Sequence, residues 1–427
     1  LSYALSLVCF VVSLMSKAWG IVLPAVLLVL VWQQGQFKQV KVLLLAWLPF
    51  ALLALVFAVL AIYAQSQLAL ADTEAHGLGA RLIQALWSPA FYLWKTLFPL
   101  NLSPLYLLRH DFQPLAFPYV LGALVTLSIT VFAVIKAKRW PGFIAAWLIF
   151  LILIAPVSGL AQSGSQLAAD RYTYLAGIVL AFGLSWGGGW LCRYIIEARG
   201  ALLSAAVILL LLSMGLSTRQ SLVWADETRL WSRALAHDPD NYVAAFNRAQ
   251  TGADGLSTEQ RLTDLNLAVE QYPGYAKAWA LRGEIHLSLG QTGAAQRDLD
   301  QAIALDPNTA RPYNNRAVLE MNQGKTLEAM DDFNAALERD PSFFEAYVNR
   351  GLLHQRMGHP EAALVDYEKA LALNSVSWQL HYNRALLLRD FGQIAAASEA
   401  FRRAQQLLPP DSPHAGKISS QLQALQP

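Results

Sequence analysis

The sequence predicts an all-α protein in which a polytopic transmembrane helical domain (residues 1–217) precedes an α-solenoid of repeated helix pairs. Two observations predict this fold class. Long apolar stretches with few charges follow one another in the first half of the 427-residue chain, and several approach the roughly 20 residues that cross a bilayer. In the second half, proline returns at a spacing of 34 residues, and a constant period of that length is typical of stacked helical repeats.

The first half contains five apolar stretches of span length and two shorter ones at its start. The predicted spans are 42–64, 117–135, 142–160, 173–192 and 201–217; residues 1–16 and 21–32 are interpreted as a partly truncated span and a short segment after it. Because so many apolar stretches are consecutive, they fit membrane spans better than buried core helices. The chain begins with Leu1 inside an apolar stretch, so we expect the natural protein to extend further toward its N-terminus.

Charge predicts the orientation of the loops. Residues 1–217 contain 12 Lys and Arg against 5 Asp and Glu, whereas residues 218–427 contain 20 against 25. The basic excess lies in short loops between spans, which indicates cytoplasmic loops and not a nucleic-acid surface. The predicted cytoplasmic residues are Lys38, Lys41, Lys136, Lys138, Arg139, Arg193 and Arg199. This topology puts the repeats outside the cytoplasm, in the periplasm if the membrane is a bacterial inner membrane.

Segment 82–98 decides this topology, because one more crossing there would invert the later loops. Its sequence, LIQALWSPAFYLWKTLF, places Trp87, Tyr92 and Trp94 around Pro89 and before Lys95. Aromatic residues of this kind are typical of the membrane interface. We therefore predict an interfacial or re-entrant helix on the outer face.

The repeats are defined by columns of matched residues. A lead-in half repeat lies within 218–241, repeats fill 242–411, and 412–427 is predicted to be a capping helix or tail; the four best repeats are 276–309, 310–343, 344–377 and 378–411. One column holds the turn glycines Gly290, Gly324, Gly358 and Gly392, and another the small residues Ala295, Ala329, Ala363 and Ala397. Small and large residues alternate because neighbouring helices interdigitate. The period and the columns identify tetratricopeptide repeats (TPRs).

Two further columns are candidates for a peptide-binding groove. One holds the asparagines Asn247, Asn315, Asn349 and Asn383, interrupted by Leu281, and the other the arginines Arg248, Arg282, Arg316, Arg350 and Arg384. An amide offers both a donor and an acceptor to a peptide backbone. The asparagine column resembles the ladder of the eukaryotic O-GlcNAc transferase, which holds the acceptor peptide in the concave groove. The alternative is that asparagine is simply common at this repeat position.

Three short stretches resemble one enzyme family. They are LMSKAWGIVLP (14–24), YLWKTLFPLNLSPLY (92–106) and ADRYTYL (169–175). Together with C-terminal TPRs they resemble the transmembrane and TPR-containing O-mannosyltransferases and their bacterial relatives, membrane glycosyltransferases of the GT-C fold. The resemblance implies a polyprenyl-phosphate-linked sugar as donor substrate and a protein acceptor outside the cytoplasm; no cofactor is assigned. It also implies a catalytic carboxylate in a first outer loop, which we expect to lie upstream of Leu1, so no catalytic residue is assigned.

Such a donor would present an anionic phosphate at the outer interface, where cations bind it. Arg171 begins a span and is the first candidate, and Lys95 lies on the interfacial segment. The full set of candidates is Arg171, Lys95, Lys17, Asp170, Tyr172, Arg109 and His110. In the plainer interpretation Asp170 pairs with Arg171, Lys95 extends toward the headgroups, and Tyr172 belongs to an aromatic belt.

Other classes of function find less support. Cys9 and Cys192 both lie in apolar stretches, which excludes a disulfide framework and a zinc site, and His354 and His359 lack a third ligand at metal spacing. A transporter would need charges within its spans, and these have almost none. The alternative to the glycosyltransferase is a non-enzymatic, membrane-anchored TPR scaffold for envelope protein assembly. Membrane lipid and a protein or peptide bound by the TPRs are the predicted partners; nucleic acid is not.

Overall fold

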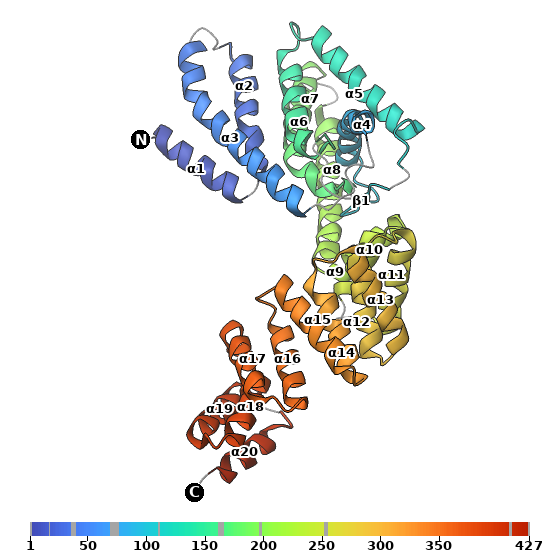
Figure 1. Ribbon diagram of the computed structural model, residues 1–427. Coiled ribbons are helices and arrows are strands. Elements are labelled where there is room, and N and C mark those ends of the chain that lie inside the picture. Colours follow the sequence, from blue (N-terminus) through green and yellow to red (C-terminus); the bar gives the residue numbers. More distant parts are fainter. Residues whose placement is uncertain are drawn as a thin grey trace. The chain divides into compact units, whose positions relative to one another are not determined.

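The computed structural model describes residues 2–16, 18–35, 40–68, 77–109, 112–160, 166–195, 199–251, 255–409 and 412–425. The chain divides into two compact units, Leu1–Ala244 and Ala245–Pro427. Helices follow one another through both units, and the described part contains one sheet, a two-stranded ribbon (Figure 1). The predicted helical fold class is confirmed; the ribbon is an addition that the hydrophobic pattern did not predict.

The first unit contains helices of very different lengths. They are α1 (Ser2–Ser16), α2 (Leu23–Gln33), α3 (Val40–Leu68), α4 (Leu78–Leu97), α5 (Phe117–Ile135), α6 (Pro141–Ile154), α7 (Thr173–Tyr194), α8 (Arg199–Trp224) and α9 (Glu227–His237), with 3₁₀ turns at Ala18–Val22, Ala155–Val157 and Asp170–Tyr172. Among the described residues, four segments are long and apolar enough to cross a membrane: Leu44–Tyr63, Phe117–Ile135, Asp170–Arg193 and Gly200–Trp224. These overlap the predicted spans 42–64, 117–135, 173–192 and 201–217.

Two predicted spans have different lengths in the structure. The 142–160 stretch is a shorter helix, because Pro156 lacks a backbone N–H and the chain tightens into a 3₁₀ turn after Ile154. The 201–217 stretch is longer than predicted: α8 continues to Trp224 through the polar residues after 217, and the next helix begins only beyond the N-cap residue Asp226. The early segments 1–16 and 21–32 are short apolar helices.

Helix α4, which covers the 82–98 segment, has one buried and one exposed face. Trp87, Ser88 and Tyr92 are buried, whereas Trp94 is 59% exposed. α4 packs against α5, where Gly122 provides the room: a Cβ there would lie 2.5 Å from Cδ1 of Trp87. This two-sided helix differs from the more uniformly apolar helices of the unit. Its position at a membrane interface stays a prediction.

The core of the first unit gathers around aromatic residues. Trp147 and Phe150 of α6 are stacked at 5.5 Å between ring centroids, and Nε1 of Trp147 donates to Oγ1 of Thr130 on α5 at 3.0 Å. Tyr92 of α4 is fully buried in the same cluster. Burying these large rings together anchors α4 to the apolar helices.

The ribbon joins two distant loops. β1 (Tyr106–Leu107) pairs antiparallel with β2 (Gln166–Ala168), with Tyr106 opposite Ala168. The two strands are too short to produce an alternating apolar pattern, so sequence periodicity could not reveal them. Their pairing brings the loop after α4 against the residues that precede α7.

The second unit is a stack of helix pairs. Its helices are α10 (Tyr242–Thr251, which starts in the first unit), α11 (Thr258–Gln271), α12 (Ala276–Ser288), α13 (Thr292–Leu305), α14 (Ala310–Asn322), α15 (Thr326–Arg339), α16 (Phe344–Arg356), α17 (Pro360–Leu373), α18 (Trp378–Asp390), α19 (Ile394–Leu407) and α20 (Ala415–Ala424). Helices that follow one another pack together, as in the α12–α13 and α14–α15 pairs (Figure 1).

The columns predicted from the sequence have the expected structural roles. The alanine column has no exposed surface, and Leu299, Phe333, Tyr367 and Phe401 are fully buried at the large-residue position. The turn glycines have φ between +69° and +78°, a conformation that is unfavourable for L-residues, which carry a Cβ. At the end of the stack, Ile418 of α20 is fully buried against the last helix pair.

Candidate functional site

A buried carboxylate connects the loops of the first unit. Asp170 is 6% exposed and accepts hydrogen bonds from the Ser103 backbone N–H and from the Tyr106 hydroxyl, whose oxygen is 3.2 Å from each carboxylate oxygen. The Asp170 N–H donates in return to the Ser103 carbonyl at 3.4 Å. Asn101 has φ +51°, so the chain turns sharply just before Ser103. Sequence reasoning missed Ser103 and Tyr106, although both lie in the 92–106 stretch that carried the family resemblance.

Lys95 lies beside this carboxylate. Its ammonium donates to the carbonyls of Leu100 and Asn101 at 3.0 and 3.1 Å, and Nζ lies 5.3 Å from the centre of the Tyr106 ring. Burial lowers the pKa of Lys95, and the charge of Asp170 opposes this shift. Burial and Asp170 raise the pKa of Tyr106, which keeps its hydroxyl protonated as a donor. Lys95 therefore holds the turn after α4 in place.

The plainer interpretation predicted an ion pair between Arg171 and Asp170, but the structure does not contain this pair. Its guanidinium is exposed, donates to Oε1 of Gln166 at 3.2 Å and lies 5.2 Å from the centre of the Tyr172 ring. The Tyr172 ring in turn lies 5.9 Å from Trp19 and 6.5 Å from Tyr92. The exposed cation is thus held beside an aromatic surface.

These contacts bring together all three stretches that carried the resemblance. Trp19 comes from 14–24, Tyr92 and Ser103 from 92–106, and Asp170 and Tyr172 from 169–175. A further bond links the last two, since the Ala169 N–H donates to the Tyr92 hydroxyl at 3.4 Å. We call Lys95, Ser103, Tyr106, Asp170 and Arg171 the Asp170 cluster. Lys17 and His110, also predicted to bind the donor phosphate, lie outside the described residues.

Arg109 contacts the start of the repeats. Its Nη2 lies 2.7 Å from Oδ1 of Asp238 and 3.4 Å from Oδ2 of Asp240, and the Asn241 amide donates to the Leu105 carbonyl at 3.5 Å. The Tyr106 ring also meets the His237 ring edge-on at 5.2 Å. Arg109 was predicted as a phosphate ligand; in the structure two carboxylates contact its guanidinium, which joins the loop after β1 to the end of the lead-in helix α9.

The arginine column is occupied by ion pairs inside the solenoid. Arg248, Arg282, Arg316 and Arg350 each form a two-pronged pair with the aspartate 16 residues later, Asp264, Asp298, Asp332 and Asp366, at 2.6–2.8 Å. Arg316 and Arg350 also reach Asp300 and Asn334 of the preceding repeat at 2.7 Å. Arg384 differs because position 400 is alanine; it lies 3.7 Å from Glu368. These arginines thus have structural partners that tie neighbouring repeats together.

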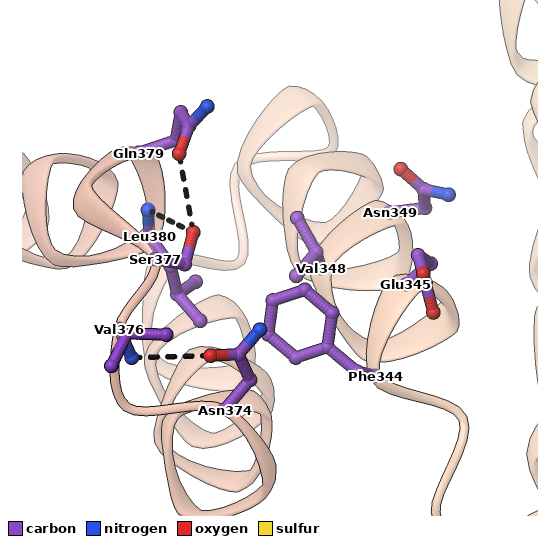
Figure 2. A pocket seen from close by; sticks show the side chains of 9 residues that line it. All are labelled: Phe344, Glu345, Val348, Asn349, Asn374, Val376, Ser377, Gln379 and Leu380. Atoms are coloured by element: carbon purple, nitrogen blue, oxygen red, sulfur yellow. Dashed lines mark hydrogen bonds between the residues drawn. The ribbon is translucent and has the colours of Figure 1, made fainter. Parts of the chain in front are cut away.

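The asparagine column contributes side chains to a groove. Asn349 donates to Oδ1 of Asn314 at 3.0 Å, and Asn315 donates to Glu284 at 3.4 Å. Asn247 and Asn383 are each half-buried. A pocket of about 480 Å³ lies beside Asn349, between α16 and the start of α18 (Figure 2). Its lining residues are Phe344, Glu345, Val348, Asn349, Asn374, Val376, Ser377, Gln379 and Leu380.

The pocket combines apolar walls with polar edges. Phe344 and Val348 of α16 lie on one side, and Val376, which is 65% exposed, lies on the loop opposite (Figure 2). The Val376 N–H donates to Oδ1 of Asn374 at 3.1 Å, so the loop is held in a turn. An apolar pocket with a few amides nearby suits a side chain of a bound peptide. No cluster of three metal-ligating side chains occurs among the described residues.

Comparison with known proteins identifies the repeats. Two family models, both described as Tetratricopeptide repeat, match residues 280–342 and 344–375, so the second unit contains TPRs as predicted. Neither model concerns a glycosyltransferase. No curated protein matches the chain.

Several solved TPR structures are similar to part of the chain. YrrB, described as a TPR protein with an unusual peptide-binding site, is 15% identical; the match covers 44% of this chain and 97% of YrrB, with a TM-score of 0.35. PilF of Pseudomonas aeruginosa is 23% identical over 44% of this chain and 90% of its own, with a TM-score of 0.37. MamA is 18% identical over 38% and 92%, with a TM-score of 0.33.

Proposed function

We propose that this protein is a membrane-anchored scaffold whose TPR groove binds an extended segment of a partner protein. The observation that carries the proposal is the pocket beside Asn349, where apolar walls and amide side chains meet on the asparagine column. Tetratricopeptide repeats provide surfaces of this kind for proteins and peptides. The long apolar helices of the first unit supply the anchor.

A photoreactive amino acid in the pocket tests this function. Placed at Val376 in the full chain in its native membranes, it is expected to cross-link one discrete partner. The matched control is Leu327, which is 74% exposed on α15, outside the pocket. The same cross-links from both positions, or none from Val376, would contradict the proposal.

We also propose that the repeats face away from the cytoplasm, because the short basic loops between the spans favour that orientation. Leu327→Cys in a chain with Cys9 and Cys192 replaced by serine supplies one exposed thiol. A membrane-impermeant maleimide is expected to label it in intact cells. Labelling only after the membrane is opened would reverse the orientation.

A second candidate function is the polyprenyl-phosphate glycosyltransferase that the family resemblance implies. It is supported by one observation: the three stretches of the resemblance converge on the Asp170 cluster, where the Arg171 guanidinium is exposed. In this function Arg171 would bind the donor phosphate, Lys95 and Asp170 would hold the surrounding loop, and the groove would present the acceptor.

Sugar transfer to protein by membranes containing the protein at its natural length tests the enzyme. Arg171→Ala is expected to lower transfer about tenfold or more, because a charge-assisted contact to phosphate is lost. Arg193→Ala, at the other end of α7, is the matched control and is expected to retain activity. No transfer by the wild type rejects the enzyme and leaves the scaffold; equal activity of both variants removes Arg171 from the donor site.

A further inference from the structure

The groove contains the same pocket twice, two repeats apart. A second pocket, of about 270 Å³, lies between α12 and the start of α14, with Phe246 and Gln250 of α10 also lining it. Eight of its lining residues correspond, at a shift of 68 residues, to eight that line the pocket beside Asn349. The matched pairs are Ala276 with Phe344, Lys277 with Glu345, Ala280 with Val348, Leu281 with Asn349, Asp306 with Asn374, Thr309 with Ser377, Arg311 with Gln379 and Pro312 with Leu380. We call them the Lys277 pocket and the Glu345 pocket.

The repeat between them fills the equivalent place with its own side chains. Phe343 stands where the two pockets have Thr309 and Ser377, and it packs into the core cluster around Ala310. The Asn314 amide, at the position of Ala280 and Val348, donates to Asn315 at 3.2 Å and accepts from Asn349. The N-cap residue of α14 or α18, Thr309 or Ser377, is small and therefore leaves the pocket open. Phe343, the N-cap residue of α16, is large and occupies the equivalent space.

The two pockets differ most in charge at their rims. The ammonium of Lys277 stands at the position of the exposed carboxylate of Glu345, and the Arg311 guanidinium at that of the neutral Gln379. Arg311 is partly offset by Glu284, 3.6 Å away, and Asp306 is engaged by the Thr309 hydroxyl at 2.6 Å. Glu345 is the single charged residue that lines its pocket, and Phe344, Val348 and Leu380 are larger than Ala276, Ala280 and Pro312, their counterparts in the Lys277 pocket.

We propose that the groove binds the partner's extended segment in one direction, with an acidic side chain beside Lys277 and an apolar side chain flanked by a basic residue in the Glu345 pocket. This inference rests on the proposed peptide-binding function and names the chemistry of its ligand. Lys277 and Glu345, which have opposite charge at the same repeat position, distinguish the two orientations of one peptide, because the reversed orientation brings like charges together at these two residues. The apolar walls supply affinity, and the charges supply direction.

Two synthetic peptides that differ only in charge test the proposal. Each has a central leucine in a Gly/Ser context, flanked by glutamates in one and by lysines in the other, and binding to the full chain in detergent is measured by fluorescence anisotropy. Glu345→Lys is expected to weaken the lysine peptide about threefold to tenfold and not to weaken the glutamate peptide. Lys277→Glu is expected to do the opposite. The two charge variants serve as controls for each other.

Variants that close each pocket distinguish binding in the groove from binding in one direction. Ser377→Phe and Thr309→Phe place in each pocket the residue that already fills the middle repeat as Phe343. Ser377→Phe is expected to abolish binding of the lysine peptide, and Thr309→Phe that of the glutamate peptide. If the closing variants block binding but the charge variants have no effect, or affect both peptides alike, directional binding is wrong and groove binding stands. If the closing variants change nothing, or neither peptide binds the wild type, both proposals are rejected.

Discussion

The two units bury carboxylates in different ways. In the repeats, Asp264, Asp298, Asp332 and Asp366 each face an arginine 16 residues earlier, so each buried charge has a two-pronged counterion. In the first unit Asp170 is held by a backbone N–H and a tyrosine hydroxyl, and no Lys or Arg nitrogen among the described residues lies within 4.0 Å of it. A buried charge without a counterion is costly.

This difference in how the buried carboxylates are held distinguishes residues with a structural role from candidates for a functional site. An arrangement that recurs in four repeats serves what those repeats share, which is their packing. The Asp170 cluster is formed once, by stretches that lie far apart in the chain, beside an exposed arginine. Perturbed polar groups of this kind concentrate at functional sites. The following variants test the contrast, in order of decreasing expected effect.

The largest effect is expected from Asp332→Ala. It leaves the half-buried guanidinium of Arg316 with only the exposed Asp300, and breaking a buried pair costs about 3 kcal/mol. Thermal unfolding of the full chain in detergent, followed by circular dichroism, measures the loss. The adjacent, exposed Asp331→Ala is the control. Equal melting temperatures for the two variants would show that the ion pairs do not stabilise the solenoid.

Asp170→Ala is expected to destabilise the first unit by about 2 kcal/mol, because the buried Ser103 N–H loses its acceptor. Asp170→Asn keeps an acceptor oxygen and is expected to recover most of the loss. Protease cleavage between α4 and α5 in detergent reports on this loop. If alanine and asparagine variants are cleaved alike, the charge of Asp170 matters more than its hydrogen bonds.

Glu320 gives the repeats a dependence on pH. It takes the place that His286 and His354 have in neighbouring repeats; it is buried, and burial and the nearby Asp332 raise its pKa to about 7. A raised folded-state pKa means that this contribution to stability is complete below about pH 4.5 and is lost as pH rises through about 7. Glu320→Gln is therefore expected to raise the free energy of unfolding at pH 8 by about 1–2 kcal/mol, with a higher melting temperature, and to change both little at pH 4. An equal shift at both pH values would contradict this assignment.

The smallest expected effect is a gain in stability, from Ala400→Asp. Ala400 stands where the other repeats have aspartate, and Nε of Arg384 is buried with no hydrogen-bond partner among the described residues. Ala400→Asp restores the pair and is expected to stabilise the last repeat by about 1 kcal/mol. Chemical denaturation of the full chain compares it with Ala400→Asn, which is expected to gain less. Destabilisation by aspartate would show that this repeat is packed differently from the others.

The sequence predicted the repeats in detail because the same residue pattern recurs in each repeat. The turn glycines and the alanine column could be placed by residue number, since a single period constrains all of them. The partners of the arginine column are also visible in the sequence, as aspartates 16 residues later in four repeats; the arginine column by itself predicts groove residues instead. The shorter α6 was likewise visible in Pro156. The ribbon and the bonds of Ser103 and Tyr106 leave no periodic trace.

By itself, the sequence determined the helical fold class, the apolar helices long enough for a membrane and the TPR period, because these depend on local composition and on spacing along the chain. The tertiary structure decided which residues separated in sequence become neighbours. It joined Ser103 to Asp170, turned Arg109 toward Asp238, and left pockets open at Thr309 and Ser377 but filled at Phe343. Those outcomes depend on loop closure and side-chain volume in three dimensions, which no one-dimensional pattern contains.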